Sequence, residues 1–381
     1  MDRRRALFLM FLFSFAAVCA GITLNYVVNP YGVWSPALID PIYRRIVHNR
    51  AEMPHLLRSA KPTMVLVGSS RIYQGMPIEQ GYRDGVLNAG LGGASLREVA
   101  EVVDLALANP RLERIVWDVD FFQLDAGFDQ EEPILDERIG GSRRLLIEDT
   151  LLNLGTLGDS FDVLKRAVRG QRSLPATKTA TVPWPSSLIC QQLEGEHFGL
   201  IRQTPTQIET QLTRSFPNLY VNYQFSTDLL QLFQQTVNRA RARGIEVIVL
   251  VPPMSQYELE LIRQRGLWKT FEDFKRSLVT VGPFLDFSGY NEIADRDELF
   301  TDVLHTKPAV GYQVLRIALG MKPAACSPGV RLVARSAVHM NRENIESELA
   351  REDAMREVAT AQNSRYSQVV AEAIEPSLID R

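Results

Sequence analysis

Cysteine and histidine are scarce in this chain of 381 residues. The three cysteines are Cys19, Cys190 and Cys326, and because Cys19 lies in an apolar N-terminal segment, at most one disulfide can form elsewhere. No CxxC motif is present, and the five histidines are scattered along the chain. We therefore expect neither a structural zinc site nor a metal centre built from several histidines.

The chain also lacks an excess of basic residues. Its 42 lysines and arginines are balanced by 45 acidic residues, for a formal net charge of −3. Domains that bind nucleic acids usually carry a basic face, so we expect no nucleic-acid partner. The hydrophobic share of 45% is enough for one large core, with room for a substantial insertion.

Charge is missing altogether from a long N-terminal run. Residues 6–28 contain no charged side chain and directly follow three arginines at positions 3–5. A membrane-spanning helix needs about 20 apolar residues. The positive-inside rule then places the arginines in the cytoplasm and everything after Asn29 outside it. We expect a single-pass anchor in the cell (inner) membrane, with the rest of the chain on the periplasmic side.

A cleaved signal peptide is the alternative for this segment. The triplet Val18-Cys19-Ala20 is similar to a small-residue cleavage site. Apolar residues continue beyond Ala20 as far as Val28, however, and this favours an anchor that stays in place.

Short apolar runs along the chain predict the strands of a sheet. They lie at residues 64–67, 85–88, 114–119, 245–251 and 284–287. Amphipathic stretches at 95–107 and 227–243 predict helices between them, and Gly244 is suited to end the second helix. Strands that are apolar throughout and alternate with helices are typical of a parallel sheet covered on both faces. The predicted fold class is therefore α/β, a three-layer doubly wound parallel sheet behind an N-terminal transmembrane helix.

These elements divide the chain into four parts. We expect the arginine cluster and anchor at 1–29, a linker at 30–60, the α/β domain at 61–322 and a charged tail at 323–381. Within the domain, residues 123–225 contain several prolines and no regular alternation, which predicts a large irregular insertion. The tail shows little core signal, and we expect it to be peripheral or partly disordered.

Residues suited to acyl transfer stand at the ends of the predicted strands. The first strand ends in Gly68-Ser69-Ser70-Arg71, the second leads into Gly90-Leu91-Gly92-Gly93, and the last is followed by Asp302 and His305. Ligands of open parallel sheets bind outside the carboxyl ends of the strands. A histidine there can accept a serine proton while an aspartate orients its ring, and glycines let backbone N–H groups approach an oxyanion.

The first two segments resemble blocks of the SGNH (GDSL-like) hydrolase superfamily. Val67-Gly68-Ser69-Ser70-Arg71 is similar to the first block, which implies Ser70 as the nucleophile. The segment from Asn88 to Ser95 is similar to the second block, which implies Gly93 as an oxyanion donor beside the amide of Ser70.

The last segment completes the resemblance, which covers roughly residues 60–320 apart from the insertion. The segment from Phe300 to His305 is similar to the family's final block with its DxxH pair. This similarity implies Asp302 and His305 as the other members of a catalytic triad. It also implies the flavodoxin-like SGNH fold and no metal or organic cofactor.

The third block departs from the family pattern. It usually contains Gly-x-Asn-Asp, whose asparagine donates to the oxyanion, but residues 117–122 here read Trp-Asp-Val-Asp-Phe-Phe. A carboxylate cannot donate unless it is protonated. The departure fits a divergent branch that resembles the alginate O-acetylation proteins and the teichoic-acid D-alanyl transfer proteins. Those relatives share an N-terminal anchor, an extracytoplasmic catalytic domain and a Gly-Ser-Ser first block.

Resemblance to this branch implies a membrane-tethered serine acyl-transfer enzyme outside the cytoplasm. It would be an O-acetyltransferase or acetylesterase acting on an envelope or exported polysaccharide, with a polysaccharide acceptor and a membrane acyl-donor protein as partners. An alternative from another class is a catalytically inactive scaffold in a polysaccharide assembly complex. A plain lipid esterase is less well supported, because the insertion shows no apolar stripe for an acyl chain.

Several of these residues also have simpler interpretations. Ser70 occupies a position where serines often cap helices.

We expect Arg71, Asn88 and Asp120 to contact substrate, although Arg71 is also suited to pair with Asp118 or Asp120. The two aspartates lie on one side of their strand and are a candidate acid/base pair of the glycosidase kind. The glycine cluster lacks the GxGxxG spacing of a dinucleotide site and follows the wrong strand.

Overall fold

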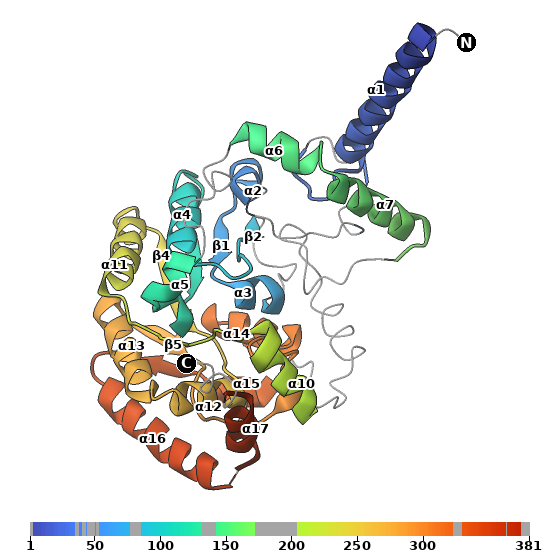
Figure 1. The fold of residues 1–381 in the computed structure, drawn as a ribbon. Coiled ribbons are helices and arrows are strands. Elements are labelled where there is room, and N and C mark those ends of the chain that lie inside the picture. Colours follow the sequence, from blue (N-terminus) through green and yellow to red (C-terminus); the bar gives the residue numbers. More distant parts are fainter. Residues whose placement is uncertain are drawn as a thin grey trace.

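The structure is a computed structural model that describes residues 3–34, 38–39, 43, 50, 53–76, 85–131, 142–171, 204–322, 330–362 and 364–374. The prediction about Cys190 and Cys326 lies outside these residues. One long helix projects from a body that is built around a single sheet (Figure 1).

The projecting helix is α1 (Arg3–Val28). Its large apolar side chains from Leu7 to Val18 are exposed. Among the residues that the structure describes, it is the one helix long and apolar enough to cross a membrane. The predicted apolar N-terminal helix is therefore confirmed.

Six strands form one sheet in the order β2-β1-β3-β4-β5-β6. They are β1 (Met64–Val67), β2 (Val86–Asn88), β3 (Arg114–Asp118), β4 (Glu246–Val251), β5 (Phe284–Asp286) and β6 (Val338–Met340). The first five are parallel, and β6 runs antiparallel to β5. The order 2-1-3-4-5 is a doubly wound arrangement, in which ligands bind near the point where the strand order reverses. All five predicted strands are confirmed, whereas β6 was not predicted.

The sheet is buried on both faces. In β1, Val65 and Val67 join one apolar cluster while Met64 and Leu66 join a second, because successive side chains of a strand point to opposite faces. Helices with residues in the first cluster include α2 (Met53–Ala60), α4 (Leu96–Leu107), α11 (Thr227–Ala242) and α13 (Trp268–Val281). Those in the second are α3 (Ser70–Gly75), α14 (Pro308–Ala318) and α15 (Val330–Ser336). The mixed α/β class with helices on both faces is thus observed.

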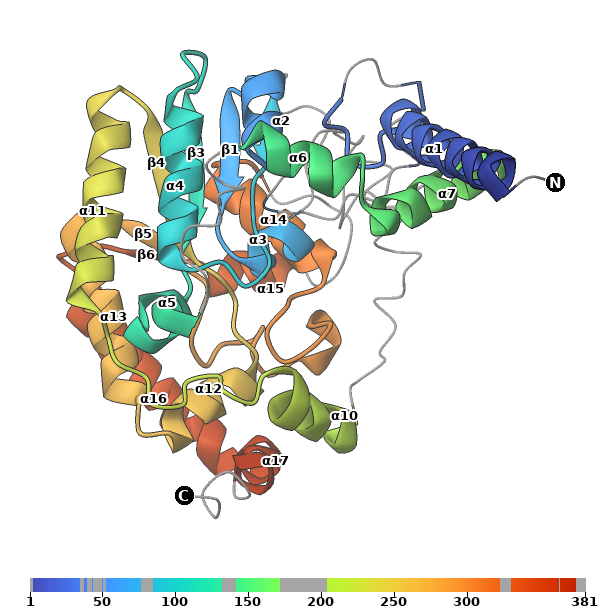
Figure 2. The ribbon, with the colours of Figure 1, turned by 45° about the horizontal axis from the view of Figure 1, so that its top comes forward.

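Shorter helices gather near the carboxyl ends of the strands, where Figure 2 shows α5, α10 and α12. They are η2 (Phe121–Leu124), α5 (Ala126–Glu131), α10 (Pro205–Thr210), the single-turn π-helix η3 (Gln211–Ser215), α12 (Gln256–Gln264) and η4 (Asp297–Leu299). These elements surround the edge of the sheet at which the candidate residues lie.

The predicted insertion at 123–225 is more regular than expected. Where it is described, it contains α5, α10 and η3, and also α6 (Arg143–Thr150) and α7 (Leu154–Val168). α6 and α7 lie beside the lower end of α1 in both ribbon views (Figures 1 and 2). Short helices interrupted by prolines lack the long apolar repeat that makes a helix legible in a sequence.

The expectation of a peripheral or disordered tail was wrong. The segment beyond residue 335 supplies the edge strand β6 and the helices α16 (Ile345–Gln362) and α17 (Ser364–Ile374). Leu349, Tyr366 and Val370 are buried in the main core. The charged composition was misleading, because one buried charge of α16, Glu352, pairs with Lys275 inside the protein. The predicted linker at 30–60 likewise includes α2, which packs against α4.

Candidate active site

Ser70 is the first residue of α3 and directly follows the turn that ends β1. Ser69 caps the helix by accepting a hydrogen bond from the Arg71 amide, so the cap is Ser69 and not Ser70. The turn must pass close to β3: a Cβ atom on Gly68 would lie 2.9 Å from the Asp118 carbonyl oxygen and 2.8 Å from Ile72. Only glycine fits there, and the turn leaves Ser70 partly exposed.

Ser70, His305 and Asp302 form a continuous chain of hydrogen bonds. The Ser70 Oγ atom lies 2.7 Å from His305 Nε2. His305 Nδ1 lies 2.8 Å and 2.9 Å from the two carboxylate oxygens of Asp302. One ring nitrogen is thus positioned to take the hydroxyl proton while the carboxylate fixes the tautomer from the other side.

Asp302 is held in its ionised form. Burial raises the pKa of its carboxyl, but the hydrogen bond from the His305 ring and those from the amides of Leu304 and His305 outweigh burial, so the net pKa is lowered. A carboxylate that accepts several N–H bonds keeps its charge. This charge stabilises the imidazolium that forms when His305 accepts a proton.

The loop that carries Asp302 and His305 is fixed from outside by two side chains. The Ser255 hydroxyl donates to the Val303 carbonyl at 2.6 Å, and the Gln211 side chain accepts from the Val303 amide at 2.9 Å. Within the loop, the Thr301 amide donates to the His305 carbonyl at 2.8 Å. Both partners of Ser70 therefore come from one short, braced segment between η4 and α14.

Gly93 lies in an exposed turn between β2 and α4 with a φ of 59°. This left-handed conformation favours glycine. The neighbouring backbone is anchored on both sides: Arg50 donates to the Gly92 carbonyl, and buried Gln123 donates to the Ala94 carbonyl. The turn is thus anchored on both sides and exposed, and the role of Gly93 as an oxyanion donor stays a prediction.

Asn88 serves the backbone of α3. Its amide donates to the carbonyls of Ile72 and Met76, and its side-chain oxygen accepts from the Gly90 amide. The side chain is 5% exposed. It ties the helix behind Ser70 to β2, and substrate contact by Asn88 stays a prediction without structural support.

Arg71 points into the protein and joins three segments. Its Nη2 donates to Glu258 at 2.6 Å and its Nη1 to the Pro253 carbonyl. Its Nε lies 2.9 Å from Asp120 in an ion pair. Burial lowers the pKa of Arg71, but the charges of Glu258 and Asp120 raise it by more. The net pKa is therefore raised, and the guanidinium stays charged. The structural pairing is therefore what the structure shows for Arg71 and Asp120.

The third-block region supplies two buried acids. Burial and then the charge of Asp120 raise the pKa of Asp118 well above its ordinary value, against the opposing effect of Arg71. Burial also raises the pKa of Asp120, although Arg71, Ser69 and His305 lower it in part. Neither carboxyl oxygen of Asp118 has a hydrogen-bond partner among the described residues. We therefore expect Asp118 to be neutral, and a neutral carboxyl is a hydrogen-bond donor.

Two members of this cluster carried no sequence signal. Glu258 lies on α12 and Tyr220 lies in the loop before α11, far from Arg71 in the sequence. The Tyr220 hydroxyl donates to the same Glu258 oxygen at 2.7 Å, and both side chains are buried. Only the folded chain brings them to Arg71.

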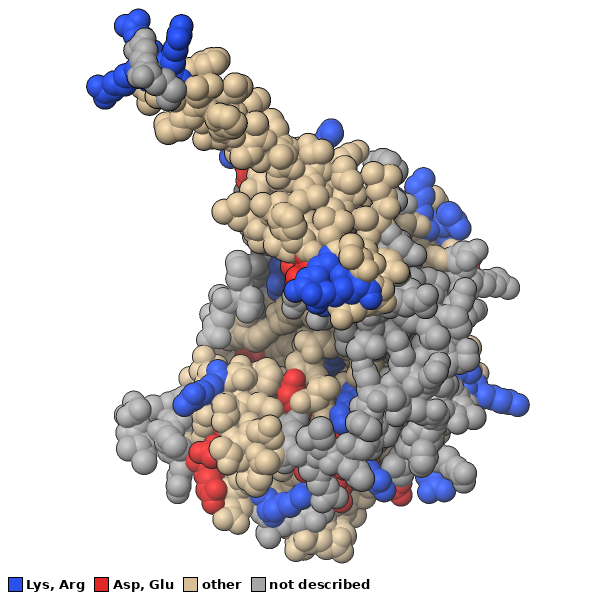
Figure 3. Space-filling view, turned by 90° about the vertical axis from the view of Figure 1, so that its right-hand side faces the viewer, with Lys and Arg blue, Asp and Glu red and all other residues tan. Residues whose placement is uncertain are grey.

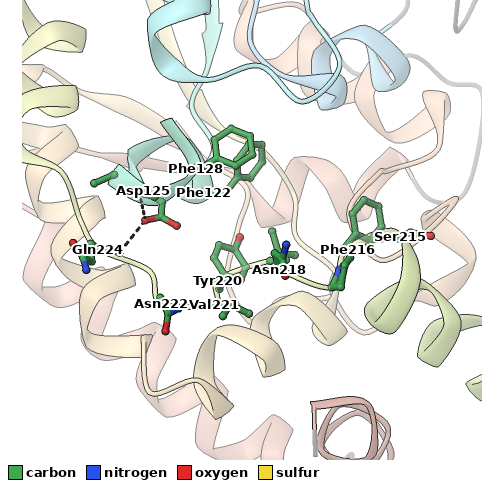
Figure 4. Close-up of a pocket in the computed structure, with 14 residues that line it drawn as sticks. Phe122, Asp125, Phe128, Ser215, Phe216, Asn218, Tyr220, Val221, Asn222 and Gln224 are labelled. Carbon is green, nitrogen blue, oxygen red and sulfur yellow. Dashed lines mark hydrogen bonds between the residues drawn. The ribbon is translucent and has the colours of Figure 1, made fainter. Parts of the chain in front are cut away.

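A cavity of about 800 Å³ is lined by residues around the start of α5 and by the loop between η3 and α11 (Figure 4). Phe216, one of its lining residues, has its ring centroid 6.4 Å from that of His305. Figure 4 shows the aromatic side chains Phe122, Phe128, Phe216 and Tyr220 together with Asn218, Asn222, Gln224 and Asp125 around it. Tyr220 and Asn222 have positive φ angles, and such strained backbone is common at functional loops. All of the lining residues except Phe122 come from the region 123–225 that the sequence predicted as the insertion.

Comparison with known proteins adds no relative. No protein-family model matches the chain, and no curated protein matches it. Among the described residues, no three His, Cys, Asp or Glu side chains are grouped so as to hold a metal ion.

Proposed function

We propose that this protein is a membrane-tethered serine acyl-transfer enzyme of the SGNH type that acts on a polysaccharide outside the cytoplasm. The observation that carries the proposal is the chain of hydrogen bonds from Ser70 through His305 to Asp302. A partly exposed serine joined to a buried histidine and an ionised carboxylate is the arrangement of an activated nucleophile. The doubly wound strand order supports the SGNH assignment.

In this proposal Ser70 and His305 share the proton transfers. The Ser70 Oγ atom attacks the ester carbonyl of the donor while His305 Nε2 accepts the hydroxyl proton. The tetrahedral intermediate then collapses, the donor's alcohol leaves with that proton, and the acyl group remains on Ser70. A sugar hydroxyl next gives its proton to His305 and attacks the acyl-enzyme, which yields the acylated sugar and free Ser70. Water in place of the sugar makes the same site an esterase.

In this proposal two backbone amides stabilise the negative charge on the tetrahedral intermediate. Ser70 is the first residue of α3, where an amide has no acceptor within its own helix. Gly93 contributes the second amide from its exposed turn. Loss of one oxyanion donor typically lowers turnover by about 10²–10³-fold. The two amides therefore supply the electrostatic part of the proposed catalysis.

We assign the cavity next to His305 to the sugar acceptor. Sugars present apolar ring faces and hydroxyl edges, and the lining combines four aromatic rings with three amide side chains and a carboxylate. Phe216 links this cavity to the catalytic histidine. A hydroxyl of a bound sugar would thus lie on the His305 side of an acylated Ser70.

One observation favours the alternative, a scaffold without activity. Residues 117–122 supply no asparagine for the oxyanion, and their two acids are buried. Such a protein would still bind polysaccharide in the cavity but would not form an acyl-enzyme.

Covalent labelling of the purified full-length chain with a fluorophosphonate serine probe separates these functions. Intact mass should show one adduct on wild type and none on the variants Ser70→Ala and His305→Ala. Ser347→Ala, at an exposed position of α16, and His339→Ala are matched controls outside the site, and both should label like wild type. A well-folded wild-type chain that takes up no probe would exclude the enzyme and leave the scaffold.

A second experiment distinguishes transferase from esterase. With p-nitrophenyl acetate as donor, an acetylated oligosaccharide product identifies transfer, and free acetate alone identifies hydrolysis. Phe216→Ala should raise the KM for the oligosaccharide while the burst of p-nitrophenol remains. A lost burst with unchanged KM would instead place Phe216 in the positioning of His305.

A further inference from the structure

An apolar stripe is exposed along one face of α7. Leu154, Phe161 and Val168 are 83%, 57% and 88% exposed. They are seven residues apart, or about two helical turns, and therefore lie on one face. On the opposite face Thr156, Ser160 and Val163 are buried. The helix is thus packed against the protein on that face and exposes apolar side chains on the other.

Charge on the exposed face is of one sign. Lys165 lies on this face between Phe161 and Val168 and is exposed. No exposed residue of α7 is acidic. The two acids of the helix are only partly exposed, and Asp159 accepts a hydrogen bond from Tyr31 at 2.7 Å. Arg169 follows as the C-cap. An apolar stripe flanked by cations is typical of a helix that lies in a membrane interface.

α7 lies beside the end of α1 and contacts it through Ser160, on the face opposite the stripe. The Asn25 side chain donates to the Leu151 carbonyl at 3.0 Å and accepts from the Ser160 hydroxyl at 2.9 Å. A Cβ atom on Gly21 would touch the Leu157 side chain. α7 is therefore fixed to the last two turns of α1, which cover about 10 Å of helix axis.

This contact sets the depth of α7 in a bilayer. The uncharged run 6–28 is about 34 Å long as a helix, slightly more than the hydrocarbon core of about 30 Å. Its last two turns then lie at the outer boundary of the hydrocarbon. Figure 3 shows an uncharged surface that runs from α1 onto the elements at the end of this helix, with Lys and Arg and a few Asp and Glu at its margin.

We propose that α7 lies in the outer headgroup region of the membrane, with Leu154, Phe161 and Val168 among the acyl chains and Lys165 and Arg169 beside lipid phosphates. The proposal rests on α1 spanning the membrane, as the proposed function states, but not on catalysis. Two attachments instead of one would hold the body at a fixed orientation to the bilayer. The continuous uncharged surface and the cations select lipid as the occupant of the stripe.

Photolabelling from lipid tests this placement. The full-length chain is reconstituted in vesicles of phosphatidylcholine and phosphatidylglycerol that contain a lipid with a carbene-forming acyl chain, and labelled peptides are mapped by mass spectrometry. Label should appear in α1 and in residues 152–168. In the triple variant Leu154→Asp, Phe161→Asp and Val168→Asp, label in 152–168 should fall at least about tenfold, while label in α1 stays. Val358→Asp, at an exposed apolar position of α16, is the control that changes neither.

The remaining outcomes are decisive. Label in α1 but not in 152–168 would overturn the proposal, as would cross-links from α7 to a second copy of the chain in place of lipid. No label in α1 would instead refute the anchor. The variant Lys165→Glu with Arg169→Glu should lose any gain in α7 labelling on going from phosphatidylcholine alone to the anionic mixture. Serine-probe labelling of Ser70 in the same samples reports folding and the proposed function separately.

Discussion

Gly311 of α14 packs directly against Gly75 at the end of α3. A Cβ atom at position 311 would lie 1.9 Å from the Gly75 carbonyl oxygen and 3.3 Å from Met76. α3 begins with Ser70 and α14 begins three residues after His305. The contact between two glycines therefore sets how closely Ser70 and His305 approach each other.

Gly311→Ala should separate these two helices. Overpacking of this kind costs about 1–3 kcal/mol in stability, and the shift should lengthen the Ser70–His305 hydrogen bond. We expect a lower melting temperature and slower labelling by the serine probe. Gly158→Ala is the matched control, because a Cβ atom there meets nothing within 4 Å. Equal labelling rates of both variants would contradict the argument.

Asp302→Asn should disable His305 without removing it. The amide cannot stabilise the imidazolium and permits the wrong tautomer, so probe labelling should slow by about 10³–10⁴-fold. Single-turnover labelling against time measures the effect, with Asp273→Asn as an exposed control. A loss below tenfold would mean that Asp302 does not orient His305.

The same substitution should change stability at low pH. The folded-state pKa of Asp302 is lowered. Its contribution to the free energy of unfolding is therefore present above its unfolded pKa of about 3.9 and is lost as pH falls through the folded-state pKa. Urea unfolding between pH 3 and pH 6 should therefore show a smaller pH slope for Asp302→Asn than for wild type. Parallel slopes would refute the lowered pKa.

Arg71→Met should be strongly destabilising. It leaves Asp120 and Glu258 buried without their cation, and breaking a buried pair costs about 3–5 kcal/mol. Lys269→Met removes the cation of an exposed pair with Asp273 and should change stability by less than about 1 kcal/mol. Denaturant titration of both variants gives the comparison. Similar losses of unfolding free energy in the two variants would show that the buried ion pairs of Arg71 stabilise the fold no more than an exposed pair does.

Glu352 gives the fold a second pH dependence of opposite sign. Burial raises its pKa to about 7, against the opposing charge of Lys275. Its contribution is thus complete below its unfolded pKa of about 4.3 and is lost as pH rises through about 7. Between pH 5 and pH 8 the melting temperature of wild type should fall more than that of Glu352→Gln. Glu357→Gln, at an exposed position of the same helix, should follow wild type.

Local patterns made the sheet and the three candidate catalytic residues predictable. β1 and β4 are short apolar runs whose neighbours are turn residues, and Ser70, Asp302 and His305 stand where such strands end. The contact between Ser70 and His305 could be expected only through the family resemblance, because 235 residues separate the two.

Features that depend on partners distant in the sequence could not be predicted. Glu352 looks like one more surface charge of a polar helix until Lys275 is placed beside it, and so the folded tail was missed. Asn88 and Arg71 looked like substrate ligands because they stand at strand ends. In the folded chain their polar atoms are used by α3 and by α12.

The large separation between Ser70 and His305 also has a consequence for biosynthesis. A ribosome makes Ser70 early and His305 only after a further 235 residues. Until the segment carrying Asp302 and His305 has been made and has docked against α3, the growing chain has a serine without a base. A truncated product that stops before residue 302 would therefore contain the apolar helix α1, the turn at Gly93 and the residues that line the cavity, yet would lack the hydrogen-bond partners of Ser70.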